Sequence, residues 1–396
     1  MSQQRLSYTV HLTFDILLAM NRGRLCLCLV LTLSTVLLLG AGCGGGDSGI
    51  RSEVVVPDAQ FPAKLAFAPD GRLFYSELRT GNIRVIDADG LLLEQPFAHV
   101  DVGTYQFWGL FGLAFDPDFE TNHYVYAYFI KPIPDGGRGV VMRFTDINNQ
   151  GTDPTVILAD LPQSSNTEST PHAGGGLLFG PDGYLYLSLG DFSPFAELLS
   201  PPLDSQDLSV LQGKIVRVNK DGSAPPDNPF VDDPDADPRI FAYGLRNPYD
   251  FSFHPSTGRM YANDNGNEDC DELNIVERGQ NYGWPLAREG CRNPDAVGPI
   301  HSFALPDKAP EEPGSNVGPT ALEFVFGDIH PALADSLLAC EFNTGFMRAL
   351  VLGGENQDEV LSDDVVAEDC QLDIAVSPDG IVYYSNQTEI RRLLPE

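Results

Sequence analysis

The chain has 396 residues, 42% of them hydrophobic, which is enough for one large or two medium domains. Its 56 Asp and Glu residues against 24 Lys and Arg give a formal net charge of −32, so nucleic acid and anionic lipid surfaces are poor partners. These carboxylates either keep an exported protein soluble or bind hard cations such as calcium, and the composition is compatible with both interpretations.

The N-terminus is predicted to be a signal peptide over residues 1–42, with the start at Met20. Two arginines precede a run rich in Leu and Val, and Gly-Ala-Gly stands directly before Cys43. This is typical of a lipoprotein signal that is cleaved before Cys43 and leaves that residue lipidated. An uncleaved membrane anchor is the alternative, because the apolar run is just about long enough to span a bilayer.

After cleavage we expect a flexible tether over residues 43–56 and one folded domain over residues 57–396. The protein would then be exported, either to the periplasm or to the extracellular face of the membrane, and touch the membrane only through its N-terminal lipid.

Four cysteines remain beyond the signal, namely Cys270, Cys291, Cys340 and Cys370. An even number of cysteines in an oxidising compartment favours disulfides. The sequence contains no CxxC pair that would indicate a zinc site instead. Four cysteines allow three pairings, and the cysteine spacing alone leaves all three open.

Six segments repeat an apolar strand, a turn rich in Pro, Asp and Gly, and a second strand with aromatic residues. They begin at Leu65, Leu113, Leu177, Phe251, Ala321 and Ile374, and the one at Ala321 is degenerate. Alternating apolar residues indicate half-buried strands, and Pro-Asp-Gly suits a tight turn. The repeat predicts an all-β, six-bladed β-propeller of four-stranded antiparallel blades with few helices. A β-sandwich would explain short strands, but not a unit that recurs six times.

Five segments carry a family resemblance. They are GLFGLAFDPDF (109–119), HAGGGLLFGPDGYLYLSLGD (172–191), LQGKIVRVNKDGS (211–223), AYGLRNPYDFSFHP (242–255) and DELNIVERGQNYGWP (271–285). In this order they resemble the glucose/sorbosone dehydrogenase family, six-bladed propellers that include aldose dehydrogenases dependent on pyrroloquinoline quinone (PQQ). The resemblance spans about residues 61–394. It implies a quinoprotein that oxidises aldose sugars at the anomeric carbon by hydride transfer to PQQ, with Ca²⁺.

The resemblance also implies catalytic roles. His172 matches the general base, Asp191 the residue that orients it, and Arg246 with Asn247 the pair that contacts the quinone oxygens. An imidazole suits this task because its pKa lies near neutrality, and a guanidinium can stabilise charge that develops on a cofactor. The alternatives are a loop histidine bonded to a carbonyl and an Arg-Asn-Pro turn that ties blades together.

Residues 263–274, NDNGNEDCDELN, are the calcium candidate. By resemblance the carbonyls of Gly266 and Asn267 would hold the ion, while Asp271, Glu272 and Tyr282 would belong to a nearby structural ion. A solvated acidic loop is the alternative.

The sequence departs from the family at the positions that anchor the cofactor. Asn343 stands where PQQ-binding members have a lysine, Cys370 and Leu372 where they have arginines, and Gln106 lies one place from the expected glutamine. Because PQQ has three carboxylates, these losses weaken its expected binding. By resemblance Cys340 and Cys370 would lie close together near the pocket, which leaves Cys270 to pair with Cys291.

Three hypotheses therefore remain. The first is the quinoprotein sugar dehydrogenase, with a sugar substrate and an unidentified electron acceptor. The second is a non-catalytic, Ca²⁺-stabilised propeller that binds carbohydrate or protein at the cell surface. The third is a calcium-dependent hydrolase of the lactonase type on the same architecture.

Overall fold

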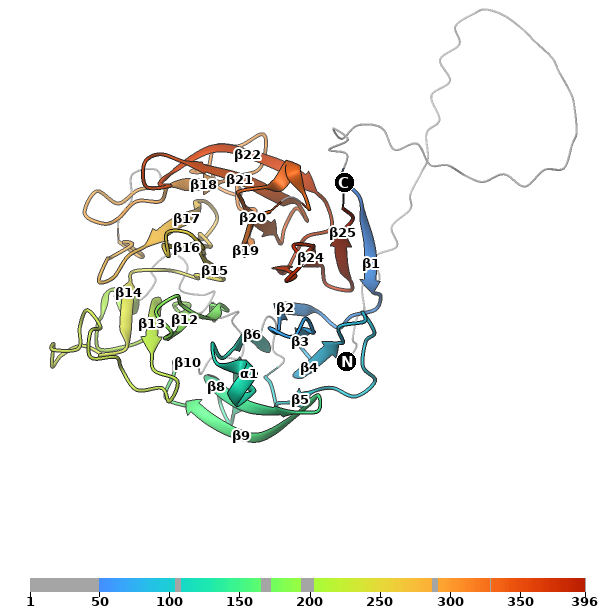
Figure 1. Cartoon of the computed structure of the whole chain (residues 1–396). Coiled ribbons are helices and arrows are strands. Elements are labelled where there is room, and N and C mark those ends of the chain that lie inside the picture. The colour runs from blue at the N-terminus through green and yellow to red at the C-terminus, as the bar shows by residue number, and fades with distance from the viewer. Residues whose placement is uncertain are drawn as a thin grey trace, which may run out of the picture. The chain divides into compact units, whose positions relative to one another are not determined.

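The computed structural model describes residues 50–103, 108–164, 172–193, 203–286, 291–327 and 329–395. Six antiparallel sheets form a ring around a central axis (Figure 1). Five sheets have four strands, and the sheet that begins with β6 has a further strand because both β9 and β10 pair with β8. The predicted six-bladed propeller is confirmed.

The strands of the six sheets have the following bounds. They are β2 (Pro62–Phe67), β3 (Leu73–Glu77), β4 (Asn82–Ile86) and β5 (Ala98–His99); β6 (Leu110–Phe115), β7 (Tyr124–Ile133), β8 (Gly136–Ile147), β9 (Gln150–Leu158) and β10 (Gln163–Ser164); β11 (Leu177–Phe179), β12 (Leu185–Leu189), β13 (Lys214–Val218) and β14 (Ile240–Tyr243); β15 (Phe251–Phe253), β16 (Met260–Asp264), β17 (Asp271–Val276) and β18 (His301–Phe303); β19 (Pro319–Val325), β20 (Ser336–Glu341), β21 (Met347–Gly353) and β22 (Glu359–Ala367); β23 (Ile374–Val376), β24 (Val382–Ser385), β25 (Ile390–Leu393) and β1 (Ser52–Val56).

Helical structure is short wherever the chain is described. It consists of α1 (Phe119–Asn122) and the 3₁₀ helices η2 (Leu203–Gln206) and η3 (Pro331–Leu333). Within the described residues, no helix has the length and apolar character needed to cross a membrane.

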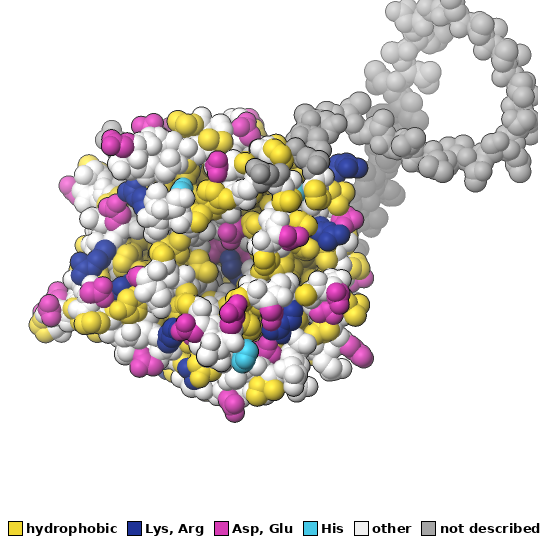
Figure 2. All heavy atoms as spheres, in the orientation of Figure 1, with side chains coloured by type: hydrophobic (Ala, Val, Ile, Leu, Met, Phe, Trp, Pro, Cys, Tyr) yellow, Lys and Arg dark blue, Asp and Glu magenta, His cyan; other side chains and the backbone are white. Residues whose placement is uncertain are grey.

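Each sequence repeat contains the innermost strand of a blade, namely β2, β6, β11, β15, β19 or β23. These strands begin at one end of the axis, where the residues around their starts, such as Phe61, Tyr249 and Leu372, line a common pocket. The turns that follow the strands therefore lie at the opposite end. In Figure 2 hydrophobic side chains surround the hollow at the centre of the ring, and acidic side chains are spread over the outer surface.

The ring is closed by strand β1, which pairs antiparallel with β25 in the register Ser52↔Leu393. The tether expected over residues 43–56 is wrong for Ser52–Val56, which form this strand. The run of three valines favours a strand, and the edge of β25 offers it backbone partners. The propeller thus begins at Ser52 rather than at residue 57, while residues 43–49 lie outside the described part of the chain.

Both expected disulfides are present. Cys270 is bonded to Cys291 and Cys340 to Cys370, across 21 and 30 residues of chain. Cys340 lies on β20 and Cys370 precedes β23, so the second bond joins two neighbouring blades beside the pocket.

Replacing Cys340 and Cys370 together by alanine is expected to lower the free energy of unfolding by about 3–4 kcal/mol, because the open chain regains the entropy of a loop of this length. Urea unfolding of the double variant and the parent, both without reductant, measures this. Equal midpoints would show that the bond does not stabilise the ring.

Candidate active site

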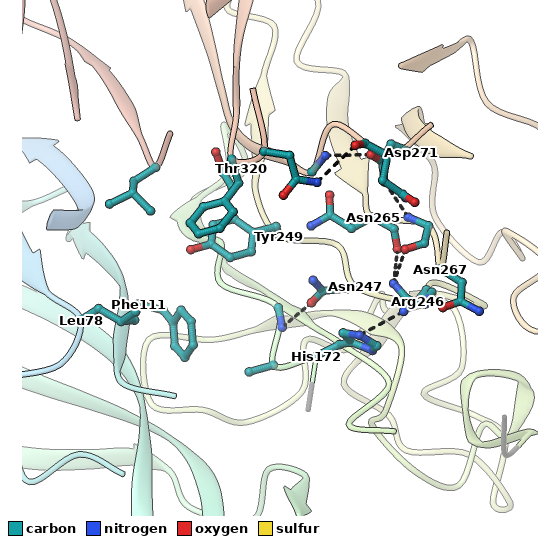
Figure 3. A pocket seen from close by; sticks show the side chains of 18 of the residues that line it. Leu78, Phe111, His172, Arg246, Asn247, Tyr249, Asn265, Asn267, Asp271 and Thr320 are labelled. Atoms are coloured by element: carbon teal, nitrogen blue, oxygen red, sulfur yellow. Dashed lines mark hydrogen bonds between the residues drawn. The ribbon is translucent and has the colours of Figure 1, made fainter. Parts of the chain in front are cut away.

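A pocket of about 370 Å³ opens where the innermost strands begin. It brings together seven of the residues predicted for the site: His172, Arg246, Asn247, Gly266, Asn267, Asp271 and Asn343. They come from segments more than 170 residues apart, and Figure 3 shows several of them around one cavity. The sequence repeat therefore gathers the candidate residues at a single end of the axis.

His172 is held at both ring nitrogens. Its Nδ1 lies 2.8 Å from Asp191 Oδ1, and its Nε2 lies 3.1 Å from Nη2 of Arg246. Burial and the charge of Arg246 lower the pKa of His172 below its ordinary value, although Asp191 acts in the opposite direction. A neutral ring therefore donates from Nδ1 to Asp191, and its Nε2 lone pair accepts from Arg246 Nη2 at the wall of the pocket.

Asp191 follows β12 and is buried behind His172. Its Oδ1 also accepts from the backbone N–H of Ser193, and its Oδ2 accepts from the indole of Trp284 at 3.0 Å. Burial alone would raise the pKa of Asp191, but the hydrogen bond from His172 and the charge of Arg246 hold it below its ordinary value. An ionised carboxylate fixed in this way sets the tautomer and the orientation of His172.

Arg246 is fixed by its backbone and its side chain. Its N–H donates to the carboxylate of Asp264, the last residue of β16, and its Nη1 donates to the carbonyls of Asn265 and Gly266. The guanidinium also lies over the Trp284 ring, 5.4 Å from its centroid. It therefore faces the pocket in a fixed position beside the candidate base.

Sequence reasoning missed the supporting roles of Asp264 and Trp284. Asp264 accepts the backbone N–H groups of Arg246 and Asn247, and burial raises the pKa of Asp264 to about 7. Trp284 belongs to the NYGWP segment and Asp264 to the predicted calcium loop, so both motifs were noted without these roles. Their contacts join segments that are distant in the sequence, so no local sequence pattern predicts them.

Asp271 anchors the loop before it. Its Oδ1 accepts from Gly266 N and Asn316 Nδ2, and its Oδ2 accepts from the N–H groups of Val317 and Gly318, at 2.7–2.9 Å. Burial raises the pKa of Asp271, while these hydrogen bonds oppose the shift. The carboxylate thus holds the loop at Gly266 against the segment that leads into β19.

The three residues expected around a structural ion do not share one cavity. Asp271 faces the main pocket, whereas Glu272 and Tyr282 line a separate space of about 20 Å³ behind Gly266. The Tyr282 hydroxyl donates to Ile275 O, and Glu272 accepts from Asn274. Within the described residues, no group of three acidic, His or Cys side chains could hold a metal ion. The expected second ion gains no support from this placement.

The loop at Gly266 fits a hard cation better. The Oδ1 atom of Asn265 is buried, and no donor in the described part of the structure reaches it. Asn265, Gly266 and Asp271 line the same pocket, where the Gly266 carbonyl accepts from Arg246 and the Asp271 carboxylate accepts four hydrogen bonds, so Asn265 Oδ1 is the acceptor that lacks a donor. Hard cations take carbonyl, amide and carboxylate oxygens, and this chemistry suits calcium.

The pocket fits the reactive end of PQQ but not its three carboxylates. Arg246 and Asn247, expected at the quinone oxygens, line the pocket, whereas Leu372 contributes an apolar wall and Asn343 an amide that donates to Asn316 O. Arg348 cannot supply a replacement charge, because it is paired with Glu341 and Asp363. The described lining residues therefore lack countercharges for three carboxylates.

Two predicted residues lie outside the described part of the chain. They are Gln106, expected at the cofactor, and Cys43, expected to carry lipid. Their roles stay predictions.

Known proteins resemble this chain in both sequence and structure. The profile of the Glucose / Sorbosone dehydrogenase family matches residues 59–394. The aldose sugar dehydrogenase YliI of Escherichia coli is 29% identical over 355 residues, which cover 84% of this chain and 89% of that protein. Quinoprotein glucose dehydrogenase B of Acinetobacter calcoaceticus is 30% identical over 259 residues, covering 59% of this chain and 52% of that protein. A crystal structure of a putative oxidoreductase (glucose dehydrogenase) from Thermus thermophilus superposes with a TM-score of 0.73 at 30% identity, covering 87% of this chain and all of that one.

Proposed function

Since the chain belongs to the glucose/sorbosone dehydrogenase family, we propose that it oxidises an aldose sugar at its anomeric carbon, with His172 as the base. The observation that carries this proposal is the hydrogen-bonded series Trp284–Asp191–His172–Arg246 at the wall of the axial pocket. Relatives named as aldose sugar dehydrogenase and quinoprotein glucose dehydrogenase support the substrate class.

The residues of the chain divide the work as follows. Nε2 of His172 accepts the proton of the anomeric hydroxyl, and Asp191 stabilises the imidazolium that forms. Arg246 donates to an oxygen on which negative charge develops. A quinone bound in the pocket would supply the chemistry of hydride acceptance.

We propose that calcium binds at Asn265–Asn267, through the buried Asn265 Oδ1 and the backbone carbonyls of Gly266 and Asn267. Chelation of purified protein is then expected to lower its melting temperature, since an ion that binds only the folded state stabilises it. Added calcium should restore the melting temperature, whereas an unchanged value on chelation would remove the ion from the proposal.

The proposal also includes export and lipidation at Cys43, which rest on the N-terminal sequence alone. Mass spectrometry of the protein from a membrane fraction tests this. An N-terminal peptide that begins upstream of Cys43 would exclude it.

The pH dependence of sugar oxidation tests the role of His172. The purified chain is supplied with calcium and a quinone, and kcat/KM for an aldose is followed by dye reduction. Because the base acts when neutral and the pKa of His172 is lowered, activity should persist below pH 6.5 and fall only at more acidic pH. No sugar-dependent reduction at any pH would refute the proposed function, and a loss of activity already above pH 6.5 would refute the base assignment.

A further inference from the structure

Apart from the calcium ion proposed at Asn265–Asn267, the described residues that line the axial pocket offer little positive charge to a bound molecule. The guanidinium of Arg79 lies over the ring of Phe61, a lining residue, but Arg79 itself is not part of the lining. Arg246 is the one cation among the described lining residues of the pocket, and Asp271 contributes a carboxylate to the same lining. The guanidinium of Arg246 is already shared among His172 and the carbonyls of Asn265 and Gly266. His172 adds no charge at neutral pH, because its pKa is lowered.

A lysine below the floor of the pocket does not change this balance of charge. Phe111, Tyr249 and Thr320 separate the pocket from a smaller space on the axis, which Lys64 lines. Lys64 Nζ lies 3.0 Å from both Asp250 Oδ2 and Asp373 Oδ1, so its charge is matched by two carboxylates. The ammonium group of Lys64 is thus neutralised by two buried carboxylates and offers no free charge to a molecule in the pocket.

The remaining walls are apolar on one side and amide-rich on the other. The apolar side chains are Phe61, Leu78, Phe111, Phe342 and Leu372, and the amides are Asn247, Asn265, Asn267, Asn316 and Asn343. Figure 3 shows Leu78 and Phe111 on the side opposite Arg246 and Asp271. Aromatic and aliphatic side chains favour the flat face of a ring system, and neutral amides favour carbonyl and hydroxyl groups.

We propose that this pocket takes a planar ortho-quinone that is uncharged or carries a single negative charge, rather than the tricarboxylate PQQ. The choice of a quinone rests on the proposed function; the charge limit rests on the pocket. In this reaction the C1–H bond of the aldose breaks, and the hydride reduces the quinone to the hydroquinone level. The proton of the anomeric hydroxyl passes to His172 Nε2, and the oxidised sugar leaves as the lactone.

The test compares PQQ with its trimethyl ester, which keeps the ring system and removes the charges. Isothermal titration of the purified chain with calcium present measures both dissociation constants without any turnover. We expect the ester to bind at least tenfold more tightly than PQQ. Tighter binding of PQQ, or no binding of either quinone, would overturn the inference.

A charge added at the rim provides a second test. Asn343 is exposed at the edge of the pocket, so Asn343→Lys is expected to tighten PQQ binding about tenfold and to change ester binding less than threefold. Asn343→Met is the control for side-chain length and should leave the ratio of the two constants as in the parent. An equal gain for both quinones in the lysine variant would show that charge does not limit binding.

These measurements also separate the two proposals. Tight ester binding without sugar oxidation would keep the charge limit and refute the proposed function. Sugar oxidation supported by tightly bound PQQ would keep the proposed function and refute the charge limit.

Discussion

His172→Asn is expected to lower kcat/KM for aldose oxidation by about 10²–10⁴-fold, the contribution typical of a positioned general base. The shorter amide can still donate to Asp191, as Nδ1 does at 2.8 Å in the parent, but it has no basic atom at the place of Nε2. The acceptor site of Arg246 Nη2 is lost with it. Steady-state kinetics with a saturating quinone measures the effect.

Stability separates a catalytic loss from a structural one. Because the contact with Asp191 is kept, the free energy of unfolding of His172→Asn should change by no more than about 1 kcal/mol, the worth of one hydrogen bond. His99→Asn is the matched control, since His99 is exposed on β5 and lies outside the pocket. Full activity in His172→Asn would refute the base, and equal losses in both variants would point to a general defect.

Lys64→Met is expected to lower the free energy of unfolding by about 3–5 kcal/mol, the usual cost of breaking a buried ion pair from one side. Lys64 lies on β2 and bridges Asp250, which precedes β15, and Asp373, which precedes β23. Burial alone would lower the pKa of Lys64, but these two carboxylates raise it above its ordinary value. Removing the ammonium would leave carboxylates of different blades facing one another at the axis.

The loss should depend on pH in a defined direction. Burial raises the pKa of Asp373 above its ordinary value and that of Glu323, on β19, to about 8. Both carboxyls therefore bind protons more readily in the folded state than in the unfolded state. Because the charge of Lys64 lowers both pKa values, its removal raises them further and increases this preference. Stability that the variant keeps at pH 5 is then lost as pH rises through these values, so the deficit is smaller at pH 5 than at pH 8.

Urea unfolding at the two pH values measures this deficit. Lys131→Met is the control, because Lys131 lies exposed on β7 and the same atoms are changed. A deficit in Lys64→Met that matches the control would show that the axial ion pairs do not stabilise the ring.

The fold was predictable because each blade repeats a local signal. The Pro/Asp/Gly turns and the apolar strands before them mark β2, β6, β11, β15, β19 and β23, and a ring is the arrangement that buries six such units. The closing strand was missed because Ser52–Val56 pairs with β25 from the other end of the chain. The three valines favour a strand, but nothing in the local sequence identifies its partner.

The site was predictable where a residue stands in a distinctive segment. His172, Arg246 and the loop at Gly266 share the pocket as expected. Lys64 was missed because a lysine in the strand PAKLAF suggests a solvent-facing position, whereas every residue of this innermost strand is buried or half-buried. The loss of positive charge from the pocket could be predicted from substitutions at single positions. The net charge of the whole lining could not, because it depends on residues from all the walls of the pocket.

The central claim is that the anomeric C–H bond of an aldose breaks in the axial pocket. Single-turnover oxidation of glucose deuterated only at C1, with the quinone bound and calcium present, tests it most directly. The account predicts slower quinone reduction than with unlabelled glucose, with the lactone as product and no reaction in His172→Asn. Equal rates for the two sugars, or a product oxidised at another carbon, would contradict it.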